Sequence, residues 1–240
     1  MCTFVYTFYV VGLLMEFLSL PKRVPTSYTW LFNLLDNRSR LETAFGPIVF
    51  NTLYMILFII QHSFMKSDLV KKIIQSIGLS AAERSIYCLT SSICLHALLK
   101  NWSFAPSIVL WQVDVENSNV LWWTFMLIHA FAWMIIYGGS FIMDIPELLG
   151  VKQAYYDIKG SVRPIFHKSF ELRRLYAHVR HPSLTGLSIV LWASNFMSVD
   201  RLLLSTMLTA YMYFAWSTNR NDVIYQRYQL KRISNEVRSR

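Results

Sequence analysis

Long apolar runs separated by short polar stretches dominate the hydrophobic pattern of this chain. Six segments are apolar enough to be considered as membrane-crossing helices, and they cover 1–20, 45–65, 85–99, 120–143, 184–199 and 202–217. A helix needs about 20 apolar residues to cross the hydrocarbon core of a bilayer. The runs are near-continuous rather than alternating, which favours helices over strands of a membrane barrel. The pattern predicts an all-α integral membrane protein with about six transmembrane helices.

Two alternatives to this interpretation concern individual segments. The third, fifth and sixth segments are close to the short limit for a crossing, so buried hairpins are an alternative there. The first segment could be a secretory signal peptide, but such a peptide carries basic residues ahead of its apolar run. Here no Lys or Arg precedes Lys22, and we therefore expect 1–20 to be a retained helix.

The composition agrees with a membrane protein. Hydrophobic residues make up 54% of the 240 residues and charged residues only 15%, whereas a soluble domain carries about 25% charged residues. With 8 Gly and 7 Pro the chain is neither collagen-like nor of low complexity. The three cysteines, at positions 2, 88 and 94, form no CxxC motif and no even disulfide framework. We expect a single polytopic domain over 1–240.

The basic residues are distributed unevenly between the two sides that six crossings define. One side holds the loop between the second and third segments, the loop 144–182 and the tail 218–240, with 4, 7 and 6 Lys and Arg residues, and the remaining loops share 6. The positive-inside rule assigns the richer side, with both termini, to the cytosol or nucleoplasm. The loop 144–182 and the tail could contact anionic lipid, lamina or chromatin. The alternative is that these basic residues only set the orientation of the protein in the membrane. No sequence-specific nucleic-acid binding is expected.

The loop 144–182 is the longest stretch outside the apolar segments. Leu148, Leu149, Val151 and Tyr155 fall near one face of a helix, which predicts an interfacial helix on the membrane surface. The loop has no repeat and no Cys/His spacing of the kind that binds zinc.

Several polar residues lie inside the apolar segments. We expect Glu16, near the end of the first segment, to reach interfacial water. His62, His96 and His129 lie at different depths, which favours neutral histidines hydrogen-bonded across helices over a shared metal site. An interfacial aromatic belt is expected to include Trp102, Trp111, Trp122 and Trp123.

The junction before the fifth segment concentrates polar chemistry. Pro182 suits the first turn of a helix, which places His178, Arg180 and His181 just ahead of that segment on the cytosolic face. A helix N-terminus beside an arginine suits a carboxylate or phosphate, and Gly186 leaves room for a ligand or another backbone. The alternative is that the basic residues only mark the membrane boundary. Two histidines alone do not make a zinc site.

A second polar cluster follows the sixth segment on the same side. It contains Arg220 and Asp222, followed by Tyr225 and Tyr228. An arginine beside an acid could hold a ligand and accept a proton. The alternative is a surface ion pair that contributes little.

The pattern Arg180-His181-Pro182-Ser183-x-x-Gly186, followed by two apolar spans and an Arg-plus-acid segment, resembles the C-terminal half of the isoprenylcysteine carboxyl methyltransferase superfamily. The resemblance implies S-adenosylmethionine as a possible cofactor and a hydrophobic acceptor, such as a prenyl-cysteine, a thiol or a lipid. Its cofactor-binding residues would be His178, Arg180, His181, Pro182 and Gly186, and its catalytic residues Arg220 and Asp222.

The chain departs from the methyltransferase pattern at two positions. The enzymes usually have Tyr where this chain has Leu184, and paired Glu after the arginine where it has Asn221-Asp222. One acid survives on a shorter side chain, so a cofactor pocket could persist while catalysis is lost.

A second resemblance covers nearly the whole chain. The segments 61–65, 147–156, 178–182 and 200–204 resemble those of the nurim family, in matching order. The resemblance implies a multi-pass protein held in the inner nuclear membrane. It favours a non-enzymatic envelope resident on a methyltransferase-like scaffold, with an active methyltransferase as the alternative. A small transporter is the weakest hypothesis, because no inverted repeat or pair of matching broken helices is visible.

Overall fold

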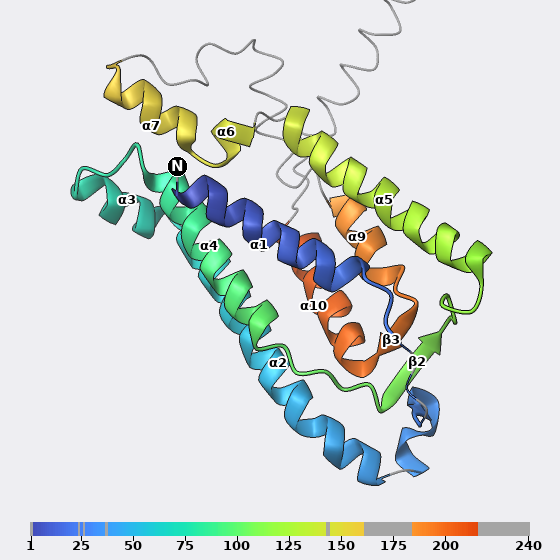
Figure 1. The fold of residues 1–240 in the computed structure, drawn as a ribbon. Helices are drawn as coiled ribbons and strands as arrows, with labels where there is room; N and C mark the ends of the chain where they lie inside the picture. Colours follow the sequence, from blue (N-terminus) through green and yellow to red (C-terminus); the bar gives the residue numbers. More distant parts are fainter. Residues whose placement is uncertain are drawn as a thin grey trace, which may run out of the picture.

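The computed structural model describes residues 2–23, 25, 27–36, 38–142, 145–160 and 184–215. A bundle of helices dominates it (Figure 1). The bundle helices are α1 (Cys2–Ser19), α2 (Arg38–Met65), α4 (Glu83–Lys100), α5 (Asn119–Ile142), α9 (Leu184–Trp192) and α10 (Val199–Ala215). The shorter elements are β1 (Thr29–Trp30), η1 (Leu31–Asp36), α3 (Asp68–Ser76), β2 (Ile108–Gln112), α6 (Ile145–Leu148), α7 (Val151–Ile158) and β3 (Phe196–Ser198).

Each bundle helix overlaps one of the six apolar segments of the sequence, and the fold is mostly helical as predicted. Among the described residues, α1, α2 and α5 are long and apolar enough to cross a membrane. Helix α4 carries Glu83, Arg84 and Lys100 in its end turns, and the described parts of α9 and α10 have 9 and 17 residues. Full crossings by these three helices stay a prediction.

The fifth apolar segment does not form one helix to its end. The sequence predicts helix through residue 199, but α9 ends at Trp192 and residues 196–198 form β3. The reason is that the residues after Trp192 find partners in the chain around β2: Val113 N donates to Asn195 O (2.7 Å) and Trp111 Nε1 to Ser194 O (3.0 Å). The prediction of a helix at 193–198 is therefore wrong.

A three-stranded sheet joins three loops at one end of the bundle (Figure 1). Its order is β1-β2-β3, with β1 parallel and β3 antiparallel to β2. Each strand comes from a different connection, namely α1 to α2, α4 to α5, and α9 to α10. These three connections therefore lie on one side of the bundle, which we call the sheet end.

The opposite end carries α3, α6 and α7 (Figure 1). The single interfacial helix predicted from Leu148 to Tyr155 is instead two short helices, because Gly150 between them has φ of +78°. A Cβ on Gly150 would lie 2.7 Å from Ser85 N, so this turn packs directly on the start of α4. Arg84 Nε and Ser85 Oγ donate to the carbonyl oxygens of Leu148 (2.8 Å) and Leu149 (3.1 Å).

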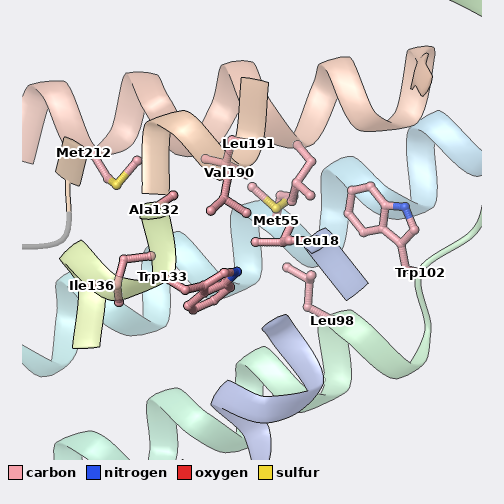
Figure 2. Close-up of a cluster of buried hydrophobic side chains, with 11 residues drawn as sticks. Leu18, Met55, Leu98, Trp102, Ala132, Trp133, Ile136, Val190, Leu191 and Met212 are labelled. Carbon is pink, nitrogen blue, oxygen red and sulfur yellow. The ribbon is translucent and has the colours of Figure 1, made fainter. Parts of the chain in front are cut away.

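All six bundle helices contribute to one apolar core (Figure 2). Its central members are Leu18 of α1, Met55 of α2, Leu98 of α4, Trp133 of α5, Leu191 of α9 and Met212 of α10. Between helices in lipid, close packing and hydrogen bonds stabilise association more than the hydrophobic effect does. Tight contact between helix backbones is therefore expected to contribute strongly here.

Helices α5 and α9 approach each other closely at Gly186. A Cβ on this residue would lie 2.7 Å from the carbonyl oxygen of Ala132 and 2.7 Å from Ile136 Cγ1. No real Cβ tolerates such a contact with backbone, so only glycine allows the two helices to pack at this distance.

We predict that Gly186→Ala destabilises the bundle by about 1–3 kcal/mol, because α5 and α9 must move apart. Gly138→Ala in α5 is the matched control, since a Cβ there meets nothing within 4 Å. Thermal unfolding of the two variants in detergent measures the difference. An unfolding temperature for Gly186→Ala equal to that of Gly138→Ala would contradict the packing described.

Candidate functional site

Most of the residues predicted for a cofactor or catalytic site fall outside the described residues. These are His178, Arg180, His181, Pro182, Arg220 and Asp222. Gly186 is described, and it is buried on the first turn of α9. The space that the sequence reserves there for a ligand or another backbone is occupied by α5. The roles proposed for these residues in cofactor binding and catalysis stay predictions.

A cavity of about 160 Å³ lies between α1, α5 and the α6 region. Its lining includes Phe8, Val11, Ile136 and Leu148. Two hydroxyls of its wall are already bonded: Thr7 Oγ1 accepts from Ser92 Oγ (3.0 Å), and Ser140 Oγ donates to the Ile136 carbonyl (2.8 Å). The cavity therefore suits hydrocarbon better than a polar group. Because Ile136 also contacts Gly186, the cavity lies beside the start of α9.

The densest polar arrangement lies at the sheet end, around Asp200. This fully buried carboxylate accepts hydrogen bonds from Trp102 Nε1 (3.0 Å), Ala105 N (3.1 Å) and Ser198 Oγ (2.7 Å). The donors belong to the α4–α5 connection and to β3, so one side chain joins two loops. A buried carboxylate is tolerated only with such hydrogen bonds.

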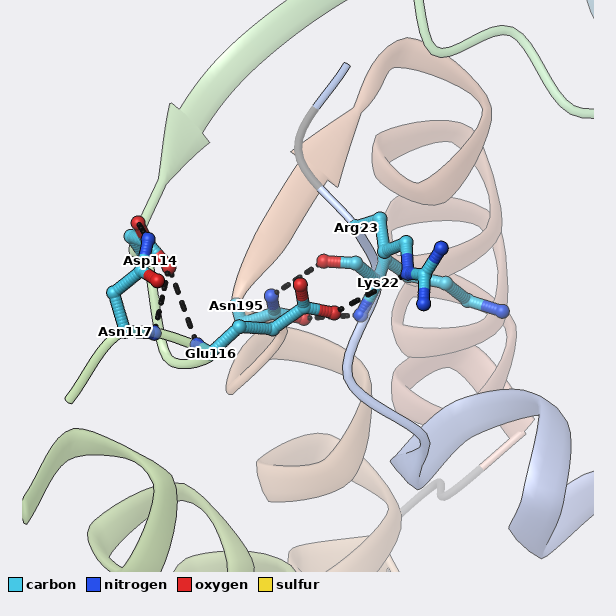
Figure 3. Close-up of polar contacts among 6 residues, drawn as sticks. All are labelled: Lys22, Arg23, Asp114, Glu116, Asn117 and Asn195. Carbon is cyan, nitrogen blue, oxygen red and sulfur yellow. Dashed lines mark hydrogen bonds and ion pairs between the residues drawn. The ribbon is translucent and has the colours of Figure 1, made fainter. Parts of the chain in front are cut away.

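Two buried asparagines bind loop backbone in the same reciprocal way. Asn51 of α2 donates to Ser103 O (2.7 Å) and accepts from Ser103 N (2.9 Å). Asn195 donates to Lys22 O (2.9 Å) and accepts from Lys22 N (2.9 Å), as Figure 3 shows. An amide side chain satisfies both backbone groups of one residue. We refer to Asp200, Asn51 and Asn195 with these partners as the buried polar cluster.

Two cations share one aromatic ring beside this cluster. The buried guanidinium of Arg201 lies 4.6 Å from the centre of the Phe17 ring and donates to the Phe17 carbonyl. Lys22 Nζ lies 5.6 Å from the same ring and 5.1 Å from that of Phe104. Burial, and next the charge of Arg201, lower the pKa of the Lys22 ammonium. Cation–π contacts offset part of the dehydration cost of these two charges.

The three histidines of the apolar segments hydrogen-bond across helices, as predicted. His62 of α2 lies 2.6 Å from the Tyr87 hydroxyl of α4, and His96 of α4 lies 2.7 Å from the Tyr6 hydroxyl of α1. His129 of α5 bonds Ser19 Oγ (2.8 Å) and the Ala193 carbonyl (3.2 Å). Glu16 is exposed near the end of α1, where interfacial water was expected.

The predicted aromatic belt needs one correction. Trp102 is buried and its indole N–H binds Asp200, so it belongs to the protein interior rather than to a lipid-facing belt. Trp123 is exposed on α5, as a belt residue should be. A buried carboxylate next to an indole donor explains why Trp102 turns inward.

The sequence pattern did not predict the buried polar cluster, because residues 200 and 201 are only the two positions between the fifth and sixth apolar segments. The short connection could have indicated this burial, because Asp200 and Arg201 alone are too few residues to form a solvated loop between two apolar segments. Chemically, both oxygens of Asp200 are bonded, which suits a structural role. Within the described ranges, no group of three His, Cys, Asp or Glu side chains is placed to hold a metal ion.

We predict that Asp200→Ala destabilises the folded protein by roughly 3 kcal/mol or more, because it leaves the Trp102, Ala105 and Ser198 donors unpaired in the interior. Asp114→Ala is the control: Asp114 accepts from Glu116 N and Asn117 N in an exposed turn (Figure 3). Chemical unfolding in detergent compares the two. If both variants unfold at the same denaturant concentration, Asp200 does not hold the loops.

Comparison with known proteins identifies close relatives of the whole chain. It is 63% identical to a protein named Nurim homolog from Drosophila pseudoobscura over 237 residues, which cover 99% of this chain and 94% of that protein. It is 60% identical to Nurim homolog of Drosophila melanogaster over 240 residues (100% and 95%). Nurim of Danio rerio is 36% identical over 187 residues (77% and 67%). No family model matches the chain, and no solved structure is similar to it.

Proposed function

Because this chain belongs to the nurim family, we propose that it is a multi-pass resident of the inner nuclear membrane with a structural rather than a catalytic role. In this proposal six helices cross the membrane, and both termini face the nucleoplasm or cytosol. The location is the one that the family resemblance implies. The basic loop 144–182 and the tail 218–240 would contact anionic lipid, lamina or chromatin.

The sheet end is the observation that carries the proposed topology. The strands β1, β2 and β3 come from the first, third and fifth connections of the six-helix order, and hydrogen-bonded strands must lie on the same side of a bilayer. An even number of crossings puts those three connections together and leaves the termini on the other side. Helices α4 and α10, with 18 and 17 residues, rise about 27 Å and about 26 Å at 1.5 Å per residue, close to the hydrocarbon thickness.

The distribution of charge supports the same orientation. The sheet end receives 6 Lys and Arg residues, and one of them, Arg201, is buried in the protein. The opposite side receives the remaining basic residues, which the positive-inside rule assigns to the cytosol or nucleoplasm. The structural role is supported by the described polar side chains inside the bundle: the histidines of α2, α4 and α5 bond neighbouring elements.

We predict that N- and C-terminal tags report the same compartment, on the nucleoplasmic side of the envelope. A glycosylation acceptor inserted beside Phe32, which is exposed at the sheet end, should be modified in the lumen. The same acceptor inserted at Gly160, exposed at the other end, should stay unmodified. Tags in opposite compartments, or modification at Gly160, would overturn the topology.

The alternative function is an S-adenosylmethionine-dependent methyltransferase acting on a hydrophobic acceptor. One observation favours it: Ile136 both lines the apolar cavity and contacts Gly186, five residues after His181. A hydrophobic acceptor in the cavity would thus lie beside Gly186, one of the residues that the resemblance assigns to the cofactor. The substitution of Asn221-Asp222 for paired Glu weighs against turnover.

We expect the purified, folded protein not to bind S-adenosylmethionine, because the structural role needs no cofactor. Calorimetric titration in detergent checks this, with Arg180→Ala and His181→Ala as site variants and Arg163→Ala as a control in the same loop. Micromolar binding that is lost in both site variants but kept in the control would replace the structural proposal with the enzyme.

A further inference from the structure

The short helix α3 lies between α2 and α4 and is capped at both ends. Ser67 Oγ accepts from Val70 N (3.4 Å) at its start, and Asp68 lies in its first turn. At its end, Gly78 has φ of +75° and donates to Gln75 O (3.0 Å), while Leu79 N donates to Ile74 O (3.0 Å). Caps at both ends stabilise a helix that is too short to persist on propensity alone.

The apolar residues of α3 divide into a packed pair and an exposed row. Val70 and Ile74 are buried against the bundle. Leu69, Ile73 and Ile77 remain 59%, 53% and 63% exposed, and their spacing of four residues places them in one line. We call these three residues the α3 stripe. Nothing in the described part of the chain covers it.

The position of α3 places the α3 stripe at the edge of the membrane. On α2, Leu57, Ile60 and Phe64 form an exposed apolar row that reaches the last turn of that helix. Helix α3 begins at Asp68, three residues after α2 ends. The stripe therefore lies at the depth where the chain leaves the hydrocarbon of the basic side.

The charges around α3 are those of a helix on an anionic leaflet. Three lysines lie in or next to α3, namely Lys66, Lys71 and Lys72. The one acid between Lys66 and Lys72 is Asp68, which forms an exposed ion pair with Lys71 (3.7 Å). Amphipathic helices with lysines on the polar face and large aliphatic residues on the other bind in the membrane plane. Basic residues near the surface are attracted to anionic headgroups.

We propose that α3 lies in the plane of the nucleoplasmic or cytosolic leaflet, with the α3 stripe inserted at the acyl boundary and its lysines on anionic headgroups. The occupant of the exposed face is thus lipid, and the inference rests on the proposed crossing by α2. In this arrangement α3 fixes the depth of the α2–α4 hairpin. The loop between these helices would then bind the membrane surface, and its basic residues would also set the orientation of the protein.

The test uses the full chain in vesicles of phosphatidylcholine with and without phosphatidylserine. A polarity-sensitive fluorophore is attached at Ile73→Cys or, as the matched control on the exposed polar face, at Gln75→Cys, with the native cysteines replaced by alanine. The Ile73 label should be quenched strongly by spin-labelled lipid and weakly by aqueous iodide. The Gln75 label should be quenched strongly by iodide and weakly by spin-labelled lipid. Lys71→Gln with Lys72→Gln should reduce the shielding at Ile73 in the anionic vesicles.

A third label, at Leu57→Cys on α2, separates the two proposals. If the Leu57 label is shielded by lipid and the Ile73 label is open to iodide, α3 is not membrane-bound while the crossing by α2 stands. If the Leu57 label is also open to iodide, the proposed topology itself fails. An Ile73 label shielded from both quenchers would indicate a protein partner and would overturn the lipid assignment.

Discussion

The buried carboxylate of Asp200 is the interaction on which the sheet end depends. It has left water completely, and three donors from two separate loops satisfy it. A buried charge with fewer partners would cost several kcal/mol, so the loops are held in the one arrangement that supplies all three. Asn51 and Asn195 extend the same principle, since each binds both backbone groups of a loop residue. Together they bring the loops that follow α1, α4 and α9 to one place.

The rest of the bundle follows from this constraint. Once the three loops are joined at one end, the helices between them must alternate in direction, and their other ends lie at the opposite end with α3, α6 and α7. Lipid supplies little hydrophobic drive between helices, so contact depends on shape and on hydrogen bonds. The glycine contact of α9 with α5 and the histidine bonds across α1, α2, α4 and α5 provide both.

Much of the helical fold could be predicted from the sequence, because a long apolar run has few other stable outcomes in a bilayer. The histidine hydrogen bonds could also be predicted, since a polar ring inside such a run needs a partner. The sheet, the early end of α9 and the burial of Trp102 could not, because each depends on a partner far away in the chain. Asp200 shows why: sequence distance hides that Trp102 and Ala105 lie beside it.

The candidate site was predictable only in part. The sequence pattern drew attention to Gly186 as a position of close approach, and the structure shows that α5 makes that approach. The pattern did not indicate an apolar cavity beside it, because the cavity is assembled from α1, α5 and the α6 region, which are distant in sequence. Family membership rests on residue identity over the whole chain and not on any one motif.

Disulfide trapping between the first and third loops tests most directly whether the loops meet at one end. Thr29 and Ile108 are partners in the β1–β2 pairing, and paired strand positions bring α-carbons within reach of a disulfide. In a cysteine-free background, Thr29→Cys with Ile108→Cys should form a cross-link in native membranes under mild oxidation. Thr29→Cys with Gly160→Cys, from opposite ends, should form none. A cross-link in the second pair, or its absence in the first in a folded protein, would contradict the sheet end and the topology built on it.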